Sequence, residues 1–239
     1  MSKNSGRSPY RRLDPGLIVE TIGQLQARIE ARFPQSELAD VCAELQRLGE
    51  ESRRRARSFA RPNWLLRLAV LVVMAGALAV IGLVGLELDL DPGTRNLFSL
   101  IPSIDAFFNV TVLVGATCFS LFTIEARLIR ARAATALRPL RAIIHVIDMH
   151  QLTKDPSVDG VVHLATPVSP PHDLTPFELS RYLDYCSEML SLTAKLAALF
   201  ALATDDAVVG TAVNEIETLA TNLSHKIWQK IMIVHRAAN

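Results

Sequence analysis

The sequence is constrained most by a long run without any charged residue, from Leu68 to Leu86. The run reads LAVLVVMAGALAVIGLVGL, and Trp64 precedes it. A helix of about 20 apolar residues crosses the hydrocarbon core of a bilayer, and tryptophan favours the boundary between lipid and water. We therefore expect a first transmembrane helix over about residues 66–87.

A second charge-free run, from Ala106 to Ile124, predicts a second transmembrane helix over about residues 104–124. Pro92-Gly93 is a turn signal between the two runs. Residues 64–124 are therefore expected to form a transmembrane hairpin.

The second run is the more polar one, and its polar residues share one side of the expected helix. Polar groups that face lipid are costly, so this side should face protein or water. It can line a narrow pore built by several subunits, or pack against small residues of the first helix, which is the favoured interpretation. The polar side comprises Asp105, Asn109, Ala116, Ser120 and Thr123, with Arg127 at its end, and the small residues are Ala75, Ala79 and Gly82.

Arginines flank both runs on the same side, whereas the segment between the runs holds only Arg95. Loops rich in Lys and Arg stay in the cytoplasm, so both termini and nearly all of the soluble mass are predicted to be cytoplasmic. The cluster before the first run should also contact anionic lipid headgroups. That cluster is Arg53, Arg54, Arg55, Arg57 and Arg61, with Arg67 beside the run, and Arg127, Arg130, Arg132, Arg138 and Arg141 follow the second run.

Composition excludes several classes of protein. Half of the residues are hydrophobic and 21% are charged, so the mean hydropathy of +0.26 reflects apolar residues concentrated in a few segments. A net charge of +1 and an aromatic content of 6% argue against a nucleic-acid partner. Cys42, Cys118 and Cys186 have no metal-ligand spacing, which fits a reducing compartment without disulfides or structural zinc. The N-terminus lacks the apolar region of a cleavable signal peptide.

Before the membrane, residues 1–14 are expected to be disordered and residues 15–60 to form two amphipathic helices. Asp14-Pro15 begins the first helix, Pro34 interrupts it, and Ser36 caps the second. Both helices should bury one apolar side. The first side is Leu17, Ile18, Ile22, Leu25, Ile29 and Phe33, and the second is Leu38, Val41, Leu45 and Leu48.

After the membrane, residues 125–152 should continue as a helix that Pro139 kinks or divides, and the proline-rich residues 153–174 should form a linker.

Residues 175–239 predict an antiparallel helix hairpin. Thr175 and Glu178 form a capping box, and Asp205 or Asp206 caps the last helix. The apolar residues of the first helix are Tyr182, Leu183, Tyr185, Cys186, Met189, Leu190, Leu192, Leu196, Ala197 and Leu199, and those of the last are Val209, Val213, Ile216, Leu223, Ile227 and Val234. The fold class is therefore all-α, a two-span hairpin with a cytoplasmic helical bundle.

Few residues indicate chemistry. His145 and Asp148 lie three apart on one side of a helix and could bind one metal ion, with His150, or His163, His172 and Asp173 from the linker, completing the site. The favoured interpretation is a solvated polar side, because this is not a known ligand spacing. Lys195, Lys226 and Lys230 are interpreted as interface charges. No hydrolase, nucleotide-binding or metalloprotease motif occurs, so we assign no catalytic residue and no cofactor.

Two strings, HVIDMHQLTKDP (145–156) and TPFELSRYLDYCSEMLSL (175–192), resemble those of an uncharacterised family of bacterial inner-membrane proteins with two spans. The resemblance covers roughly the second half of the chain and implies a multi-pass protein of the bacterial inner membrane, without an activity. The general plan also resembles SLATT-type effectors, in which cytoplasmic helices flank two spans, and that likeness carries no functional residue.

The favoured function is an oligomeric inner-membrane module, which means a scaffold, a sensor or a small pore. The alternative is a membrane anchor that presents a helical platform to a soluble partner, and the third hypothesis is a membrane-bound enzyme with an unrecognised site. The expected partners are membrane lipids, further copies of the chain and a cytoplasmic protein.

Overall fold

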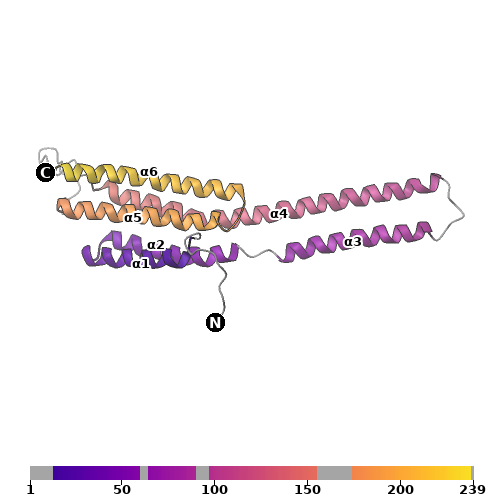
Figure 1. The fold of residues 1–239 in the computed structure, drawn as a ribbon, viewed down its shortest axis with the longest axis horizontal. Helices are drawn as coiled ribbons and strands as arrows, with labels where there is room; N and C mark the ends of the chain where they lie inside the picture. Colours follow the sequence, from indigo (N-terminus) through magenta and orange to yellow (C-terminus); the bar gives the residue numbers. More distant parts are fainter. Residues whose placement is uncertain (1–12, 60–63, 90–96, 155–173, 238–239) are drawn as a thin grey trace, which may run out of the picture. The chain divides into compact units, whose positions relative to one another are not determined.

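The computed structural model describes residues 13–59, 64–89, 97–154 and 174–237 (Figure 1). Every regular element in these ranges is an α-helix, which confirms the all-α class. The helices are α1 (Pro15–Arg32), α2 (Glu37–Phe59), α3 (Trp64–Asp89), α4 (Leu97–Leu152), α5 (Pro176–Ala201) and α6 (Ala207–Ala237).

The chain divides into two compact units. The first, here called the helical domain, contains α1, α2, α5, α6 and the part of α4 from Arg132 onward. The second, here called the apolar hairpin, contains α3 and the part of α4 up to Ala131. The expected disordered tail 1–14 and the linker 153–174 lie almost wholly outside the described residues.

In the helical domain, α1 and α2 begin and end where the sequence predicts. The Asp14 carboxylate accepts a hydrogen bond from the Gly16 N–H at 2.7 Å, and α1 ends before Pro34. In the turn, Gln35 has a positive φ of 59°. The Ser36 hydroxyl then accepts from the Ala39 N–H at 3.3 Å and caps α2.

The apolar sides of α1 and α2 face the domain interior, as predicted. The exceptions are Leu17, which is exposed in the first turn, and Leu48, which is half-buried. Gly49 lets α2 approach α1 closely, because a Cβ added there would lie 3.2 Å from Val19 Cγ2. The buried hydrophobic residues of these two helices are Ile18, Val19, Ile22, Leu25, Ile29, Leu38, Ala39, Val41, Cys42, Leu45 and Ala56.

Helices α5 and α6 run antiparallel and side by side (Figure 1), as the predicted hairpin requires. The Thr175 N–H donates to Glu178 Oε2 at 2.8 Å, and the Glu178 N–H donates to the Thr175 hydroxyl at 3.3 Å, so the capping box is present. These hydrogen bonds from Thr175 lower the pKa of Glu178. Asp206 caps α6 by accepting from the N–H groups of Val208 at 2.9 Å and Val209 at 3.2 Å.

Every apolar position predicted for the α5–α6 hairpin is buried. Helix α1 packs against α5 through Phe33, whose ring meets that of Tyr182 edge-on at 5.7 Å, and through the Arg28–Glu188 ion pair. The Arg141–Glu215 ion pair joins α4 to α6. The predicted bundle core is therefore present in the helical domain.

Of the kink or division expected at Pro139, the division is wrong, because the helix is continuous from Leu97 to Leu152 and also contains Pro102. A proline within a helix removes one hydrogen bond and costs about 3 kcal/mol. Around Pro139, however, Ala136, Leu137 and Leu140 are all buried in the helical domain, and their packing opposes that cost.

In the apolar hairpin, the large side chains of α3 and α4 are exposed rather than packed, for example Leu71 at 65% and Phe119 at 74%. In the ranges described, one helical stretch, Phe107–Leu152, is long and apolar enough to cross a membrane, and none of its apolar window is buried. Arg67–Leu83 forms a shorter apolar helical stretch.

Candidate functional site

The most polar buried region of the helical domain is the C-terminal end of α4. The Gln151 side chain is only 2% exposed, and its amide donates to the Asp148 carboxylate at 2.7 Å. The Gln151 Oε1 atom is also buried and has no hydrogen-bond partner among the described residues. A buried oxygen of this kind is costly unless a water molecule satisfies it.

Lys230 of α6 binds this end of α4. Its ammonium group donates to the backbone oxygen of Gln151 at 2.9 Å and approaches that of Lys154 at 3.4 Å. The last carbonyl groups of a helix lack partners within it and carry partial negative charge, so a lysine here stabilises the helix end. Lys230 thus acts as a cap supplied by another helix, beyond the interface charge inferred from sequence.

The other two lysines singled out in the sequence have different environments. Lys195 is exposed and donates to the Ser191 hydroxyl at 2.6 Å within α5, and Lys226 is exposed on α6. Neither contributes to the polar region at the end of α4.

The metal candidates do not form a complete site in the described part of the chain. His145 is exposed, Asp148 accepts from Gln151, and the described residues contain no group of three or more potential ligands. His150 Nδ1 instead lies 3.5 Å from the Glu37 carboxylate of α2. His163, His172 and Asp173, which could complete the site, lie outside the described residues.

Two buried thiols lie in the core of the helical domain. Burial raises the pKa of Cys42, and likewise that of Cys186, from 9.0 to about 12. Burial also raises the pKa of Tyr182. Because the thiolate is the nucleophilic form, these two cysteines are chemically inert at neutral pH.

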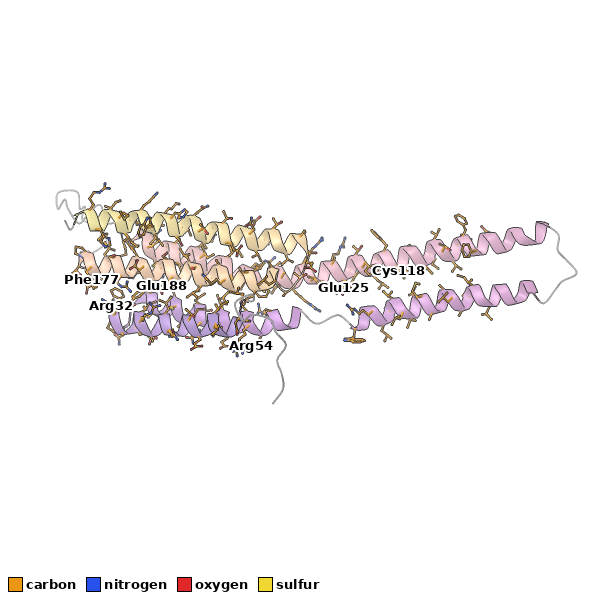
Figure 2. All side chains as sticks on the ribbon, viewed as in Figure 1. Arg32, Arg54, Cys118, Glu125, Phe177 and Glu188 are labelled. Atoms are coloured by element: carbon orange, nitrogen blue, oxygen red, sulfur yellow. The ribbon has the colours of Figure 1, made fainter. Side chains whose placement is uncertain are left out.

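An apolar groove of about 650 Å³ lies between the start of α5 and the end of α6. Phe177, Trp228 and Met232 line it and are largely exposed, with Trp228 at 60%. Arg181 and Asp184 line it too and pair with each other at 2.9 Å. Figure 2 labels Phe177 beside Arg32 of α1, whose guanidinium carbon lies 5.4 Å from the ring centre.

The groove does not follow from the sequence pattern, because the apolar periods of α5 and α6 mark only the buried sides of these helices. The available signal was that Phe177, Trp228 and Met232 are large apolar residues outside the buried stripes. Nothing in their spacing indicates that the ends of the two helices meet.

The arginines predicted to bind lipid headgroups are partly neutralised within α2. Arg53 pairs with Glu50 at 3.4 Å, and Arg55 pairs with Glu51 at 3.0 Å, each one turn along the helix. Arg54 is exposed. Nothing is described of the side chains of Arg57 and Arg61.

The predicted polar side of the second span is exposed along α4. Asp105, Asn109, Ala116 and Ser120 are exposed, and Thr123 is half-buried. The Asn109 amide donates to the Asp105 carboxylate at 3.3 Å. The hydroxyls of Ser120 and Thr123 donate to backbone oxygens one turn back, those of Ala116 at 2.9 Å and Phe119 at 2.8 Å.

These hydrogen bonds lower the cost of exposing the hydroxyl groups of Ser120 and Thr123 to lipid. A hydroxyl that donates to its own helix backbone has no unsatisfied proton, so facing lipid costs it less. Contact with lipid therefore costs less free energy for Ser120 and Thr123 than for Asp105 and Asn109, which need protein or water as a neighbour.

Comparison with known protein families, with curated proteins and with solved structures gives no match for this chain.

Proposed function

We propose that the chain is an oligomeric module of the bacterial inner membrane. In this proposal the apolar hairpin crosses the bilayer twice, and the helical domain lies in the cytoplasm. The observation that carries the proposal is a contrast in burial: most apolar side chains of the helical domain are buried, whereas no described residue of the hairpin is buried and most of its large apolar side chains are exposed.

This contrast favours a membrane over an aqueous environment for the hairpin. Burying apolar surface is worth about 25 cal/mol per Å², and monomeric soluble proteins rarely expose large contiguous apolar patches. A core helix of a soluble protein would be covered by its own chain, whereas the apolar window of α4 is not. A bilayer supplies the missing cover for both α4 and α3.

Orientation rests on the arginines. Those that flank the two apolar segments would have to cross the membrane if the helical domain were outside, and loops rich in arginine resist translocation. The proposal therefore places both termini in the cytoplasm.

Self-association is supported by small residues with free space around them. A Cβ added at Gly76, Gly82 or Gly115 would meet no heavy atom within 4 Å, so no helix in the described ranges occupies these sites. Small residues allow membrane helices to approach closely and gain van der Waals contact. A second copy of the hairpin can use this space.

Within such an oligomer, helix packing is favoured over a pore, because Ser120 and Thr123 already satisfy their hydroxyl protons. A pore would depend on Asp105 and Asn109. Conductance in planar bilayers separates the two forms: a pore gives a current whose cation selectivity changes with Asp105→Asn, and packing gives no current.

Two measurements test the module as a whole. Alkaline carbonate should leave the full-length protein in the membrane pellet, and its mass in detergent, corrected for bound detergent, should be a multiple of 26.3 kDa. Release by carbonate would overturn the membrane assignment, and a monomeric mass would overturn the oligomer.

The second candidate is a membrane anchor whose helical domain holds a soluble partner, and the groove between α5 and α6 favours it. Exposed Trp and Phe are typical of protein interfaces. Arg32 beside the groove matches an amphipathic partner helix with carboxylates next to its apolar residues.

The fluorescence of Trp228 tests the anchor. The variant Trp64→Phe leaves Trp228 as the single tryptophan. An anchor predicts a monomer in detergent with solvent-exposed emission. An oligomer with shifted, quencher-protected emission would mean that another copy covers the groove.

A further inference from the structure

One end of the apolar hairpin carries cations beside an exposed aromatic ring. Trp64, at the start of α3, is 76% exposed, and Arg67 is exposed one turn later. Arg127 is exposed on α4. Because α3 and α4 run in opposite directions, the first turn of α3 and the stretch of α4 around Glu125 lie at the same end of the hairpin (Figure 2).

Charge neutralisation separates these arginines from two members of the cluster singled out in the sequence, Arg53 and Arg55. Arg53 and Arg55 each pair with a glutamate of their own helix, and Arg53 Nε is buried. In the part of the chain that is described, Arg67 and Arg127 pair with no carboxylate. Arg54 of α2 is also exposed and has no carboxylate partner among the described residues, so the contrast lies between the paired Arg53 and Arg55 and the unpaired Arg67 and Arg127.

We propose that Arg67 and Arg127 bind the phosphate groups of anionic phospholipids at this end of the hairpin, with Trp64 at the same depth. The inference rests on the proposed membrane function and adds a lipid class and two residues to it. A guanidinium fork matches two phosphate oxygens, and tryptophan favours the headgroup level. Each arginine near an anionic surface contributes about 1 kcal/mol, which is about fivefold in affinity.

This assignment differs from the prediction made from sequence. An arginine already paired with glutamate has much of its charge neutralised before any lipid arrives, so Arg53 and Arg55 should contribute little. Arg67 and Arg127 should carry most of the preference for anionic lipid.

The test uses the full-length protein, delipidated in detergent and returned to nanodiscs with equal amounts of phosphatidylglycerol and phosphatidylcholine. Native mass spectrometry then identifies the lipids that stay bound. The wild type should retain phosphatidylglycerol. The double variant Arg67→Gln/Arg127→Gln should lose about 25-fold in apparent affinity, because two fivefold effects multiply.

Two variants control for charge and for insertion. Arg53→Gln/Arg55→Gln should stay within about threefold of the wild type if those charges are already neutralised. Arg67→Lys/Arg127→Lys preserves the flanking charge needed for orientation but loses the two-oxygen contact of the guanidinium fork, so it should keep a preference for phosphatidylglycerol that is weaker than that of the wild type. This variant remains informative if the glutamine variant fails to insert. Inorganic phosphate in the same medium should not displace the lipid.

Equal retention of the two lipids by the wild type would overturn the proposal. So would full retention of phosphatidylglycerol by the Arg67→Gln/Arg127→Gln variant, an equal loss in the Arg53→Gln/Arg55→Gln variant, or loss of preference in the lysine variant. Displacement by inorganic phosphate would point to a soluble anion instead of a lipid. If carbonate leaves the protein in the membrane but the protein shows no lipid preference, only the lipid proposal is wrong. If carbonate releases the protein, the proposed membrane function is wrong as well.

Discussion

Among single residues, leucines show most clearly which positions stabilise the helical domain. Leu196, in α5, is 0% exposed, and its Cδ1 lies 3.7 Å from the place of a Cβ added at Gly49. Leu202, just after α5, is 71% exposed. Two leucines six residues apart in sequence therefore have opposite environments.

Leu196→Ala should lower the free energy of unfolding by about 2–5 kcal/mol, because it removes buried methyl groups and leaves a cavity. Leu202→Ala, the matched control, should change it by less than about 0.5 kcal/mol. Denaturation of the full-length protein in mild detergent, followed by circular dichroism, measures both. Equal effects of the two substitutions would contradict the packing of α5 against α2.

The buried thiols lead to a second prediction for single residues. The raised pKa values of Cys42 and Cys186 mean that the unfolded chain releases these protons near pH 9, whereas the folded chain keeps them until about pH 12. The stability linked to these neutral thiols is thus fully present below pH 9. It is lost as pH rises from about 9 towards 12.

At pH 8, a maleimide should modify neither Cys42 nor Cys186 in the folded protein, and it should modify both after denaturation. Mass spectrometry of the digested protein identifies the modified positions. Labelling of either cysteine at the same rate in both states would mean that its environment is open.

Among the helices, α4 depends on a contact from α6. Lys230→Met removes the ammonium group from the Gln151 and Lys154 carbonyls and should cost about 1.5–3 kcal/mol, the range for hydrogen bonds to a charged group. Hydrogen exchange of the amides near Ile147 and Gln151 should accelerate as the last turn frays. Lys226→Met, on the exposed side of α6, is the control and should leave that exchange unchanged.

The helices that could be predicted are those whose signals are local. Asp14-Pro15 and Thr175-Pro176 begin helices because each places a capping side chain within three residues of the N–H group that it binds. The apolar sides of α5 and α6 follow from their 3.6-residue period, and their burial confirms them.

What the sequence did not predict depends on residues distant along the chain. Lys230 binds the backbone oxygen of Gln151, 79 residues away in the sequence, and no periodic pattern of residues predicts such a contact. The sequence shows that a proline at position 139 is costly within a helix, but it does not show that Leu137 and Leu140 are buried in the helical domain. The continuity of α4 at Pro139 therefore could not be predicted. The groove around Trp228 is unpredictable for the same reason.

For the whole molecule, the two compact units correspond to two kinds of apolar pattern. Helices with one apolar side are covered by one another in the helical domain, whereas α3 is apolar on all sides, the first part of α4 is mostly apolar, and neither has a buried residue in the described ranges. A helix that is apolar all round needs a surrounding apolar phase. The molecule thus combines one part that buries its own apolar surface with another whose apolar surface is left uncovered, which the proposed membrane function would explain.

Topology can be tested with single cysteines introduced at Ser5, Thr94 and Ala238, all outside the described residues. Cys118→Ser removes the half-buried native thiol, and the buried Cys42 and Cys186 can stay because they should not react. A maleimide that cannot cross membranes should label Thr94→Cys on intact cells, and Ser5→Cys and Ala238→Cys only after permeabilisation. The expectation follows from charge: the segment between the spans holds one arginine, and an outward helical domain would require the flanking arginines to cross an apolar barrier. Labelling of either terminus on intact cells would overturn this orientation, and with it the cytoplasmic placement of the groove.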